Sequence, residues 1–206
     1  MNELLSTIND LIHSNIRRTI RQRIQQFKSI DTYSAEELFQ ELSFCILTAN
    51  CNAERTIHIH TQLIRSFYTD TAETIRKKLK EHGYRFPNRA TYLAKAAQYK
   101  DRLPTILHTK SHEERRTWLV DNIPGLGNKE ASHFLRNIGF DDYAIIDFHI
   151  LDILERHHLI TRPTTLTTKK YREIEEVLRV LAIQTHLTLA ELDLYLWYLE
   201  TGKILK

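Results

Sequence analysis

Apolar residues recur every three or four positions along most of the chain, and this period constrains the fold more than any other feature. It is the period of an α-helix that buries one face. Between residues 4 and 27 it predicts a helix with a single buried stripe. The same spacing returns at 38–49, 57–67, 174–181 and 192–199. Strand-like alternation occurs only in "TIHIHT", which is too short to build a sheet, so the sequence predicts an all-α fold.

Helix boundaries are marked by capping residues and by glycine and proline. Three pairs have the spacing of a capping box, namely Ser34 with Glu37, Asp70 with Glu73, and Thr188 with Glu191. Gly202 is well placed to end the last helix. The stretch "EHGYRFPNRA" contains Gly83 and Pro87 and is predicted to be a loop.

The charge balance permits an anionic partner without requiring one. Lysine and arginine total 29 against 26 acidic residues, a net charge of +3. Any strongly basic surface must therefore come from local arrangement. The first helical stretch carries Arg17, Arg18, Arg21, Arg23 and Lys28, which are compatible with a solvated helix face or with a stripe that faces phosphates.

The cysteine content and the apolar runs exclude several classes of protein. The two cysteines, Cys45 and Cys51, are too few for a disulfide scaffold or a four-cysteine metal site, and are best explained as buried thiols. The N-terminus lacks the pattern of a signal peptide, and no run approaches the roughly 18 apolar residues of a membrane span. We expect a soluble intracellular protein.

The stretch "IPGLGNKEASHFLRNIG" opens with two of the five glycines, Gly125 and Gly127, which lie between one helix and the next, which Asn128 could cap. Glycine permits positive φ and, lacking a side chain, lets another group approach the backbone. The following helix directs its free N–H groups and the positive end of its dipole toward this turn. Gly125 and Gly127 therefore suit a phosphate, although an ordinary helix connection fits the pattern equally well.

Lys129 occupies the first turn of that second helix, where the helix dipole disfavours an ammonium group. A nucleophilic lysine must be a neutral amine, a form favoured by burial and by a helix N-terminus. A solvent-facing or phosphate-binding charge is the alternative explanation. Asp147 lies eighteen positions later, after three apolar residues, where an aspartate would ordinarily cap a helix.

The hairpin, Lys129 and Asp147 together resemble the helix-hairpin-helix superfamily of DNA base-excision glycosylases. The stretches "ELSFCILTANCNAE", "GLGNKEASHFLRNIG", "AIIDFHILDIL" and "YLETGKILK" are similar to the type 2 8-oxoguanine DNA glycosylase/lyases, compact proteins of mostly archaeal distribution. The resemblance runs from about Ser34 to the last residue. It implies two helical lobes, with residues 34–141 forming a central bundle that holds the helix-hairpin-helix motif and residues 1–33 plus 142–206 forming the second lobe.

The resemblance also implies a bifunctional DNA repair enzyme that excises 8-oxoguanine from duplex DNA and nicks the abasic strand. Lys129 would attack C1′ of the deoxyribose, displace the base and form a Schiff base from which β-elimination follows. Asp147 would stabilise positive charge on the sugar and help position or deprotonate the amine. Gly125 and Gly127 would bind phosphates of the damaged strand through backbone N–H groups.

Four further residues receive roles from the resemblance. Asn50 would fill the space left by the extruded nucleotide and Phe86 would wedge into the opposite strand, although capping or packing explains either residue as well. Trp197 could stack on the extruded base or simply belong to the core. Lys206 would help distinguish 8-oxoguanine from guanine, because oxidation adds an N7–H donor that a placed acceptor can recognise.

No metal or redox cofactor is expected, although a monovalent cation could bind among the hairpin carbonyls. The histidine pairs at 58 and 60 and at 157 and 158 lack the spacing of a helical metal site. The expected partner is double-stranded DNA containing 8-oxoguanine, bound by a cytoplasmic monomer without membrane association. Two alternatives stay open: a glycosylase for another lesion, such as an oxidised pyrimidine or mismatched base, and a non-enzymatic module that binds DNA or protein through the hairpin.

Overall fold

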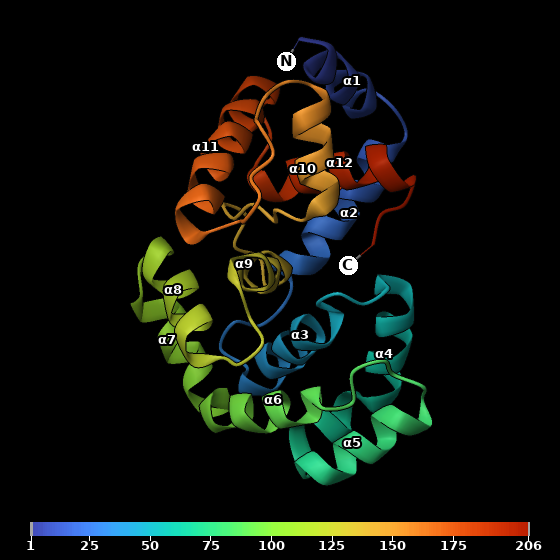
Figure 1. Cartoon of the computed structure of the whole chain (residues 1–206), viewed down its shortest axis with the longest axis vertical. Helices are drawn as coiled ribbons and strands as arrows, with labels where there is room; N and C mark the ends of the chain where they lie inside the picture. Colours follow the sequence, from blue (N-terminus) through green and yellow to red (C-terminus); the bar gives the residue numbers. More distant parts are fainter. Residues whose placement is uncertain (1, 206) are drawn as a thin grey trace. The chain divides into compact units, whose positions relative to one another are not determined.

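The computed structural model describes residues 2–205, which form twelve α-helices and one short 3-10 helix without any β-strand (Figure 1). The all-α prediction is confirmed. Contacts between Cα atoms divide the chain into two compact units. The terminal unit runs to Ser29 and resumes at Gly139–Ile204, and the central unit comprises Ile30–Ile138, with Leu205 grouped with it. The sequence-based prediction places the limits between the two lobes at residues 33/34 and 141/142.

The central unit is built around one buried helix. Its elements are α3 (Ala35–Thr48), α4 (Ala53–Thr69), α5 (Ala72–Glu81), α6 (Arg89–Ala96), the 3-10 helix η1 (Ala97–Arg102), α7 (Leu103–Thr109), α8 (His112–Asn122) and α9 (Asn128–Asn137). Ten of the fourteen residues of α3 are buried, because α4, α6, α7 and α9 all pack against it. A helix that is apolar on nearly every side belongs in a core, and Cys45 is buried there as expected.

The terminal unit joins the two ends of the chain through two hydrophobic clusters. Its helices are α1 (Asn2–Ile12), α2 (Ile16–Lys28), α10 (Phe148–Arg156), α11 (Thr168–Thr185) and α12 (Leu189–Thr201). Helix α12 packs against each of the other four. The Thr188–Glu191 capping box at its start is formed, and Gly202, with φ +68°, ends it, as the sequence predicts.

Outside the hairpin, two sequence-based helix boundaries are wrong. The predicted helix across residues 4–27 is interrupted between α1 and α2, because the His13 ring and the Ser14 hydroxyl bond the carbonyls of Asn9 (2.7 Å) and Leu11 (2.8 Å). Such side-chain bonds offer the backbone an alternative to continuing the helix.

The second error concerns the start of α5, which is capped by Thr71 instead of Asp70. The Asp70 carboxylate forms an ion pair with Lys78 at 2.8 Å. The Ser34 box is only half formed, because Ser34 accepts the Glu37 N–H while the Glu37 carboxylate accepts the Asp31 N–H (3.0 Å). The "TIHIHT" segment lies inside α4.

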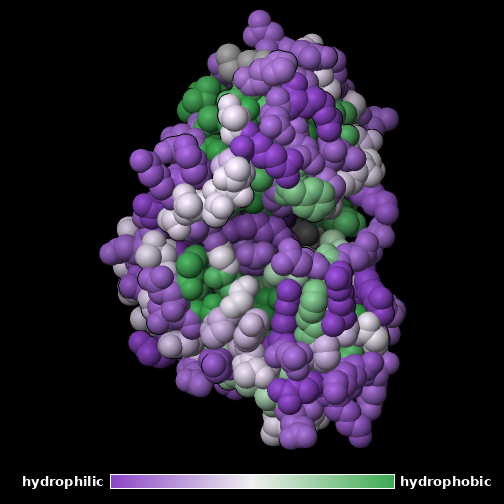
Figure 2. Space-filling view, viewed as in Figure 1, coloured by the Kyte–Doolittle hydropathy of each residue, from purple (hydrophilic) through white to green (hydrophobic). Residues whose placement is uncertain are grey.

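One face of the molecule is mainly polar. Figure 2 shows a face dominated by hydrophilic residues, with hydrophobic ones in scattered patches. None of the described helices combines the length and apolar character needed to cross a membrane. Across residues 2–205, no group of three or more His, Cys, Asp or Glu side chains is arranged to hold a metal ion.

Candidate functional site

The hairpin between α8 and α9 contains two glycines, and only Gly125 has a backbone conformation that favours glycine. Gly125 has φ +89°, and a Cβ there would lie 2.7 Å from Cδ2 of the Tyr92 ring. Gly127 has φ −96° and ψ −172°, an extended conformation open to any residue, so the expectation of positive φ is wrong there. A Cβ on Gly127 would meet only the Glu130 carboxylate, at 3.3 Å. The lack of a side chain at Gly127 therefore keeps the backbone accessible.

Lys129 stands in the first turn of α9, directly after this hairpin. The N-cap is Gly127, one residue before the Asn128 expected from the sequence. Glu130 accepts the Gly127 N–H through Oε2 at 3.2 Å, and its Oε1 lies 3.8 Å from Nζ of Lys129. The Lys129 side chain is 26% exposed, so the amine is partly shielded yet reachable from solvent.

The rest of α9 holds Lys129 on a rigid support. Ala131, Phe134 and Leu135 are fully buried in the central unit, where α9 packs against α3 and α8. A buried hydrogen bond joins Asn137 Nδ2 to Glu41 Oε2 of α3 at 3.3 Å. Reactive groups on well-packed helices keep their geometry better than groups on loops.

Asp147 belongs to the terminal unit and caps α10, as the sequence predicts. Its Oδ1 accepts the Ile150 N–H at 3.0 Å. Its other oxygen, Oδ2, has no hydrogen-bond partner among residues 2–205. One oxygen therefore fixes the side chain while the other remains available to a ligand.

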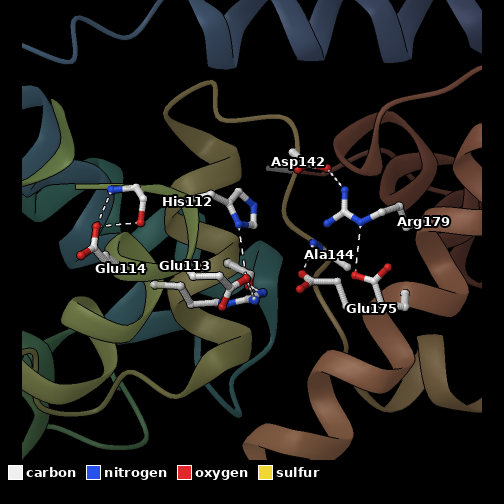
Figure 3. A network of polar contacts seen from close by, with 11 residues as sticks. His112, Glu113, Glu114, Asp142, Ala144, Glu175 and Arg179 are labelled. Atoms are coloured by element: carbon white, nitrogen blue, oxygen red, sulfur yellow. Dashed lines mark hydrogen bonds and ion pairs between the residues drawn. The ribbon is translucent and has the colours of Figure 1, made fainter. Parts of the chain in front are cut away.

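The segment before Asp147 is fastened to α11 by polar side chains. The Tyr171 hydroxyl donates to the Ala144 carbonyl at 2.7 Å and accepts the Ile146 N–H at 3.2 Å. Glu175, one turn further on, accepts the Ala144 N–H at 3.0 Å (Figure 3). Tyr171 and Glu175 are spaced four apart on one helix face, so α11 sets the place of Asp147.

Figure 3 shows the bond between Glu175 and Ala144 together with a separate network of polar contacts in the central unit. On the α11 side, Arg179 forms an ion pair with Asp142 at the start of the same segment. At the start of α8, the Glu114 carboxylate accepts the backbone N–H and the hydroxyl of Ser111 at 2.9 and 2.6 Å. These bonds complete the capping box of α8, which leads into the hairpin.

An aromatic group follows Asp147 in the terminal unit. The Phe148 ring is 58% exposed and lies 3.8 Å from the His149 ring between centroids. The His149 ring meets Trp197 edge-on at 4.9 Å. The indole Nε1 of Trp197 is buried and has no hydrogen-bond partner within the described chain. Sequence analysis assigned Trp197 but missed Phe148 and His149 as its companions.

Asn50 and Phe86 lie on two loops of the central unit. Asn50 is exposed just beyond the end of α3, in the left-handed conformation with φ +51°. Phe86 is half-buried, and the guanidinium groups of Arg85 and Arg89 lie 5.0 and 4.9 Å from its ring centroid. Cation–π contacts of this kind restrain an aromatic ring that is only partly packed.

Arg89 links the two loops and was missed by sequence analysis. Its Nη1 donates to the carbonyls of Ile46 (3.0 Å) and Leu47 (2.9 Å), which α3 leaves unpaired at its end. It also donates to the Tyr84 hydroxyl (3.0 Å), which in turn donates to Leu47 at 2.5 Å. Burial raises the pKa of Tyr84 above its ordinary value. Lys206 lies outside the described residues, so its expected role is not addressed by this geometry.

Known proteins resemble this chain over nearly its whole length. A family model described as 8-oxoguanine DNA glycosylase matches residues 20–187. An 8-oxoguanine DNA glycosylase/AP lyase of Methanocaldococcus jannaschii is 46% identical over 205 residues, which cover 98% of this chain and 99% of the relative. The protein of the same name from Korarchaeum cryptofilum is 42% identical over 209 residues, covering 100% and 99%.

Two solved structures share the fold. The crystal structure of the Methanocaldococcus jannaschii 8-oxoguanine glycosylase/lyase in complex with 15mer DNA containing 8-oxoguanine matches with a TM-score of 0.95 and 46% identity, over 99% of this chain and 100% of that one. The 8-oxoguanine DNA glycosylase of Thermotoga maritima matches with a TM-score of 0.92 and 37% identity, over 100% of this chain and 99% of that one.

Proposed function

The chain belongs to the 8-oxoguanine DNA glycosylase family, and we propose that Lys129 and Asp147 are its catalytic residues. It is an 8-oxoguanine DNA glycosylase/AP lyase, and the substrate that we propose is double-stranded DNA containing 8-oxoguanine. The names of its relatives favour this activity over a non-enzymatic binding module.

In the first reaction, the neutral Lys129 amine attacks C1′ of the deoxyribose. The bond between C1′ and N9 breaks, its electron pair leaves with the base, and the base takes up the proton that the attached amine loses. Asp147 offers its second carboxylate oxygen to the positive charge that develops on the sugar. The sugar ring then opens as O4′ takes up a proton, and the lysine nitrogen remains joined to C1′ as a protonated Schiff base.

In the second reaction, the Schiff base draws electrons toward nitrogen and acidifies C2′. A base removes a proton from C2′, and the bond from C3′ to its phosphate oxygen breaks, which nicks the strand. Water then hydrolyses the Schiff base and regenerates the lysine amine. These steps use only protein groups and water, and we propose no metal or redox cofactor. A monovalent cation among the hairpin carbonyls would act on DNA binding alone.

The remaining site residues hold the DNA in our proposal. Gly125 and Gly127 present backbone N–H groups to phosphates, and the open backbone at Gly127 supports this role. Asn50 fills the space left by the extruded nucleotide, and Phe86 wedges into the opposite strand. Trp197 stacks on the extruded base, and Lys206 contributes to the choice of 8-oxoguanine over guanine. The enzyme acts in the cytoplasm on nucleoid DNA.

The observation that carries the proposal is a single lysine, partly shielded, in the first turn of a helix that follows a hairpin of restricted conformation. Borohydride reduction of the Schiff base tests it by joining enzyme and DNA irreversibly. The wild-type enzyme and Lys80→Gln, which changes an exposed lysine of α5, should each form an adduct with an 8-oxoguanine duplex. Lys129→Gln should form none, and an undiminished adduct would reassign the nucleophile.

Asp147→Asn gives a separate test of the carboxylate. The amide oxygen can still accept the Ile150 N–H, so the cap of α10 and the fold should be retained. Loss of the charge should slow base excision by about 10²- to 10⁴-fold under single-turnover conditions. A rate equal to that of the wild type would remove Asp147 from the chemistry.

A further inference from the structure

Helix α2 of the terminal unit carries a concentration of positive charge that the catalytic site does not explain. The segment Ile16–Lys28 contains four arginines and one lysine and no acidic residue. Lys28 is paired with Asp141 at 2.8 Å. Arg17, Arg18 and Arg21 are exposed, and none of the three forms an ion pair with a carboxylate of residues 2–205. Their charge is therefore uncompensated within the described chain.

These arginines border an open hollow of about 1060 Å³ along the exposed face of α2. Its lining includes the guanidinium groups of Arg17, Arg18 and Arg21 and four side-chain amides, from Asn15, Gln22, Gln25 and Gln26. Among residues 2–205, no carboxylate and no aromatic ring lines it. Guanidinium groups bind phosphate oxygens through paired N–H donors, and amides add further donors.

The opposite face of α2 fixes the helix in place. Ile20, Ile24 and Phe27 are buried against Leu194 and Tyr195 of α12. Burial raises the pKa of Tyr195, while the positive charges of Arg17 and Arg21 act in the opposite direction.

One carboxylate, Glu191, also acts on Tyr195. It accepts the Thr188 N–H at 2.9 Å and is thereby held in the capping box of α12. It does not line the hollow and leaves the three arginines available to a ligand.

We propose that this hollow is a second phosphate-binding surface that holds the DNA backbone through Arg17, Arg18 and Arg21. The inference rests on the proposed function and adds to it, because the hairpin binds phosphate through backbone amides whereas α2 uses side-chain charge. A free nucleotide would call for an aromatic ring to stack on, and a protein partner for an apolar anchor, and the lining provides neither. A polyanionic backbone needs only the donors that are present.

The salt dependence of DNA binding tests the surface. The variant Arg17→Gln/Arg18→Gln/Arg21→Gln is compared with Lys77→Gln/Lys80→Gln/Lys169→Gln, which removes the same charge from exposed positions on α5 and α11. Each phosphate contact adds about 0.9 to the slope of log Kd against log salt, so the arginine variant should lose about 2–3 from this slope for an undamaged duplex. The lysine control should lose less than about 1.

A slope unchanged in the arginine variant, or an equal loss in the lysine control, would overturn the proposal. Competition by a glutamate-rich peptide as strong as that by DNA would also overturn it, in favour of an acidic protein partner. If the triple variant fails to fold, Arg17→Gln and Arg21→Gln are measured singly, and each should lose about 0.9.

Borohydride trapping at saturating enzyme separates this surface from the catalytic proposal. The arginine variant should form as much adduct with an 8-oxoguanine duplex as the wild type, because α2 supplies affinity and no chemistry. A wild-type enzyme that forms no adduct would defeat the proposed function while leaving the slope measurement valid.

Discussion

The Lys129 amine lies 3.8 Å from a carboxylate oxygen of Glu130, whose other oxygen accepts the Gly127 N–H at 3.2 Å. One side chain thus contacts the proposed nucleophile and also occupies a backbone donor proposed to bind phosphate. In the free enzyme the Glu130 carboxylate occupies the place in which a DNA phosphate would interact favourably with the Gly127 N–H. Phosphate binding at this hairpin therefore competes with an internal anion.

We expect Glu130→Gln to bind undamaged duplex about 2- to 5-fold more tightly, which corresponds to the ~0.5–1 kcal/mol typical of a charge at a helix terminus. The glutamine amide oxygen can still accept the Gly127 N–H, so the cap is kept while the negative charge is lost. Fluorescence anisotropy gives the dissociation constant. Glu73→Gln, in the first turn of α5, is the matched control and should change it little. Unchanged or weaker binding by Glu130→Gln would contradict the competition.

Replacing Gly125 with alanine should destabilise the protein more than the same change at Gly202. Gly125→Ala places a side chain at φ +89° and against Tyr92, and should lower the free energy of unfolding by about 2–4 kcal/mol. Gly202→Ala is the control for backbone strain alone, with φ +68° and no atom within 4 Å, and should cost about 1–2 kcal/mol. Urea denaturation compares them. Equal losses at both positions would show that Tyr92 does not restrict the hairpin.

Gly127→Ala should separate stability from DNA binding. Its extended backbone accepts alanine, so the free energy of unfolding should change by less than about 0.5 kcal/mol. The added methyl group stands where phosphate is proposed to approach, and duplex affinity should fall about tenfold or more. A variant that is stable and binds DNA normally would exclude close backbone contact at Gly127.

Tyr84 should make stability depend on pH in alkaline solution. Burial raises the pKa of Tyr84, so the native state keeps the phenolic proton after the unfolded state has lost it. The stabilising contribution is complete below pH 10.0, the ordinary pKa, and declines as pH rises above it. Tyr84→Phe should be about 0.5–1.5 kcal/mol less stable near neutrality, because it loses the bond to Leu47, and should show a flatter decline.

Urea denaturation between about pH 9 and 11.5 measures this dependence. Tyr33→Phe, which alters a side chain that is 72% exposed, should follow the wild type. Parallel curves for wild type and Tyr84→Phe would mean that Tyr84 ionises as readily in the native state as in the unfolded state.

Trp197 should report base capture through its fluorescence. Stacking on a base changes indole emission, whereas Trp118 lies in the central unit against Tyr99, with 5.2 Å between ring centroids. In the Lys129→Gln background, Trp118→Phe should retain the emission change on addition of an 8-oxoguanine duplex, and Trp197→Phe should lose it. The same change in both variants would return Trp197 to a packing role.

Local patterns in the sequence predicted the helical elements and several of their ends. Asp147, Thr188 and Gly202 cap their helices as expected, because caps depend on residues three or four apart. The break between α1 and α2 was missed because the Ser14 hydroxyl bonds the carbonyl of Leu11, which the continuing helix would have used. Periodicity alone does not register that competition.

The supports of the site could not be predicted from local patterns. Arg89 bonds Leu47, 42 residues earlier in the chain, and Glu175 bonds Ala144, 31 residues earlier. Such pairings arise only once the helices pack. The one available signal was the spacing of Tyr171, Glu175 and Arg179, whose polar groups recur every four residues along one face of α11.

Identification of the trapped residue tests the central claim most directly. The enzyme is reduced with borohydride on an 8-oxoguanine duplex, digested with a protease that cuts after glutamate, and the modified peptide is sequenced by mass spectrometry. We predict that the deoxyribose remnant is carried by the side-chain nitrogen of Lys129. A remnant on any other lysine, or on the N-terminal amine, would contradict the account.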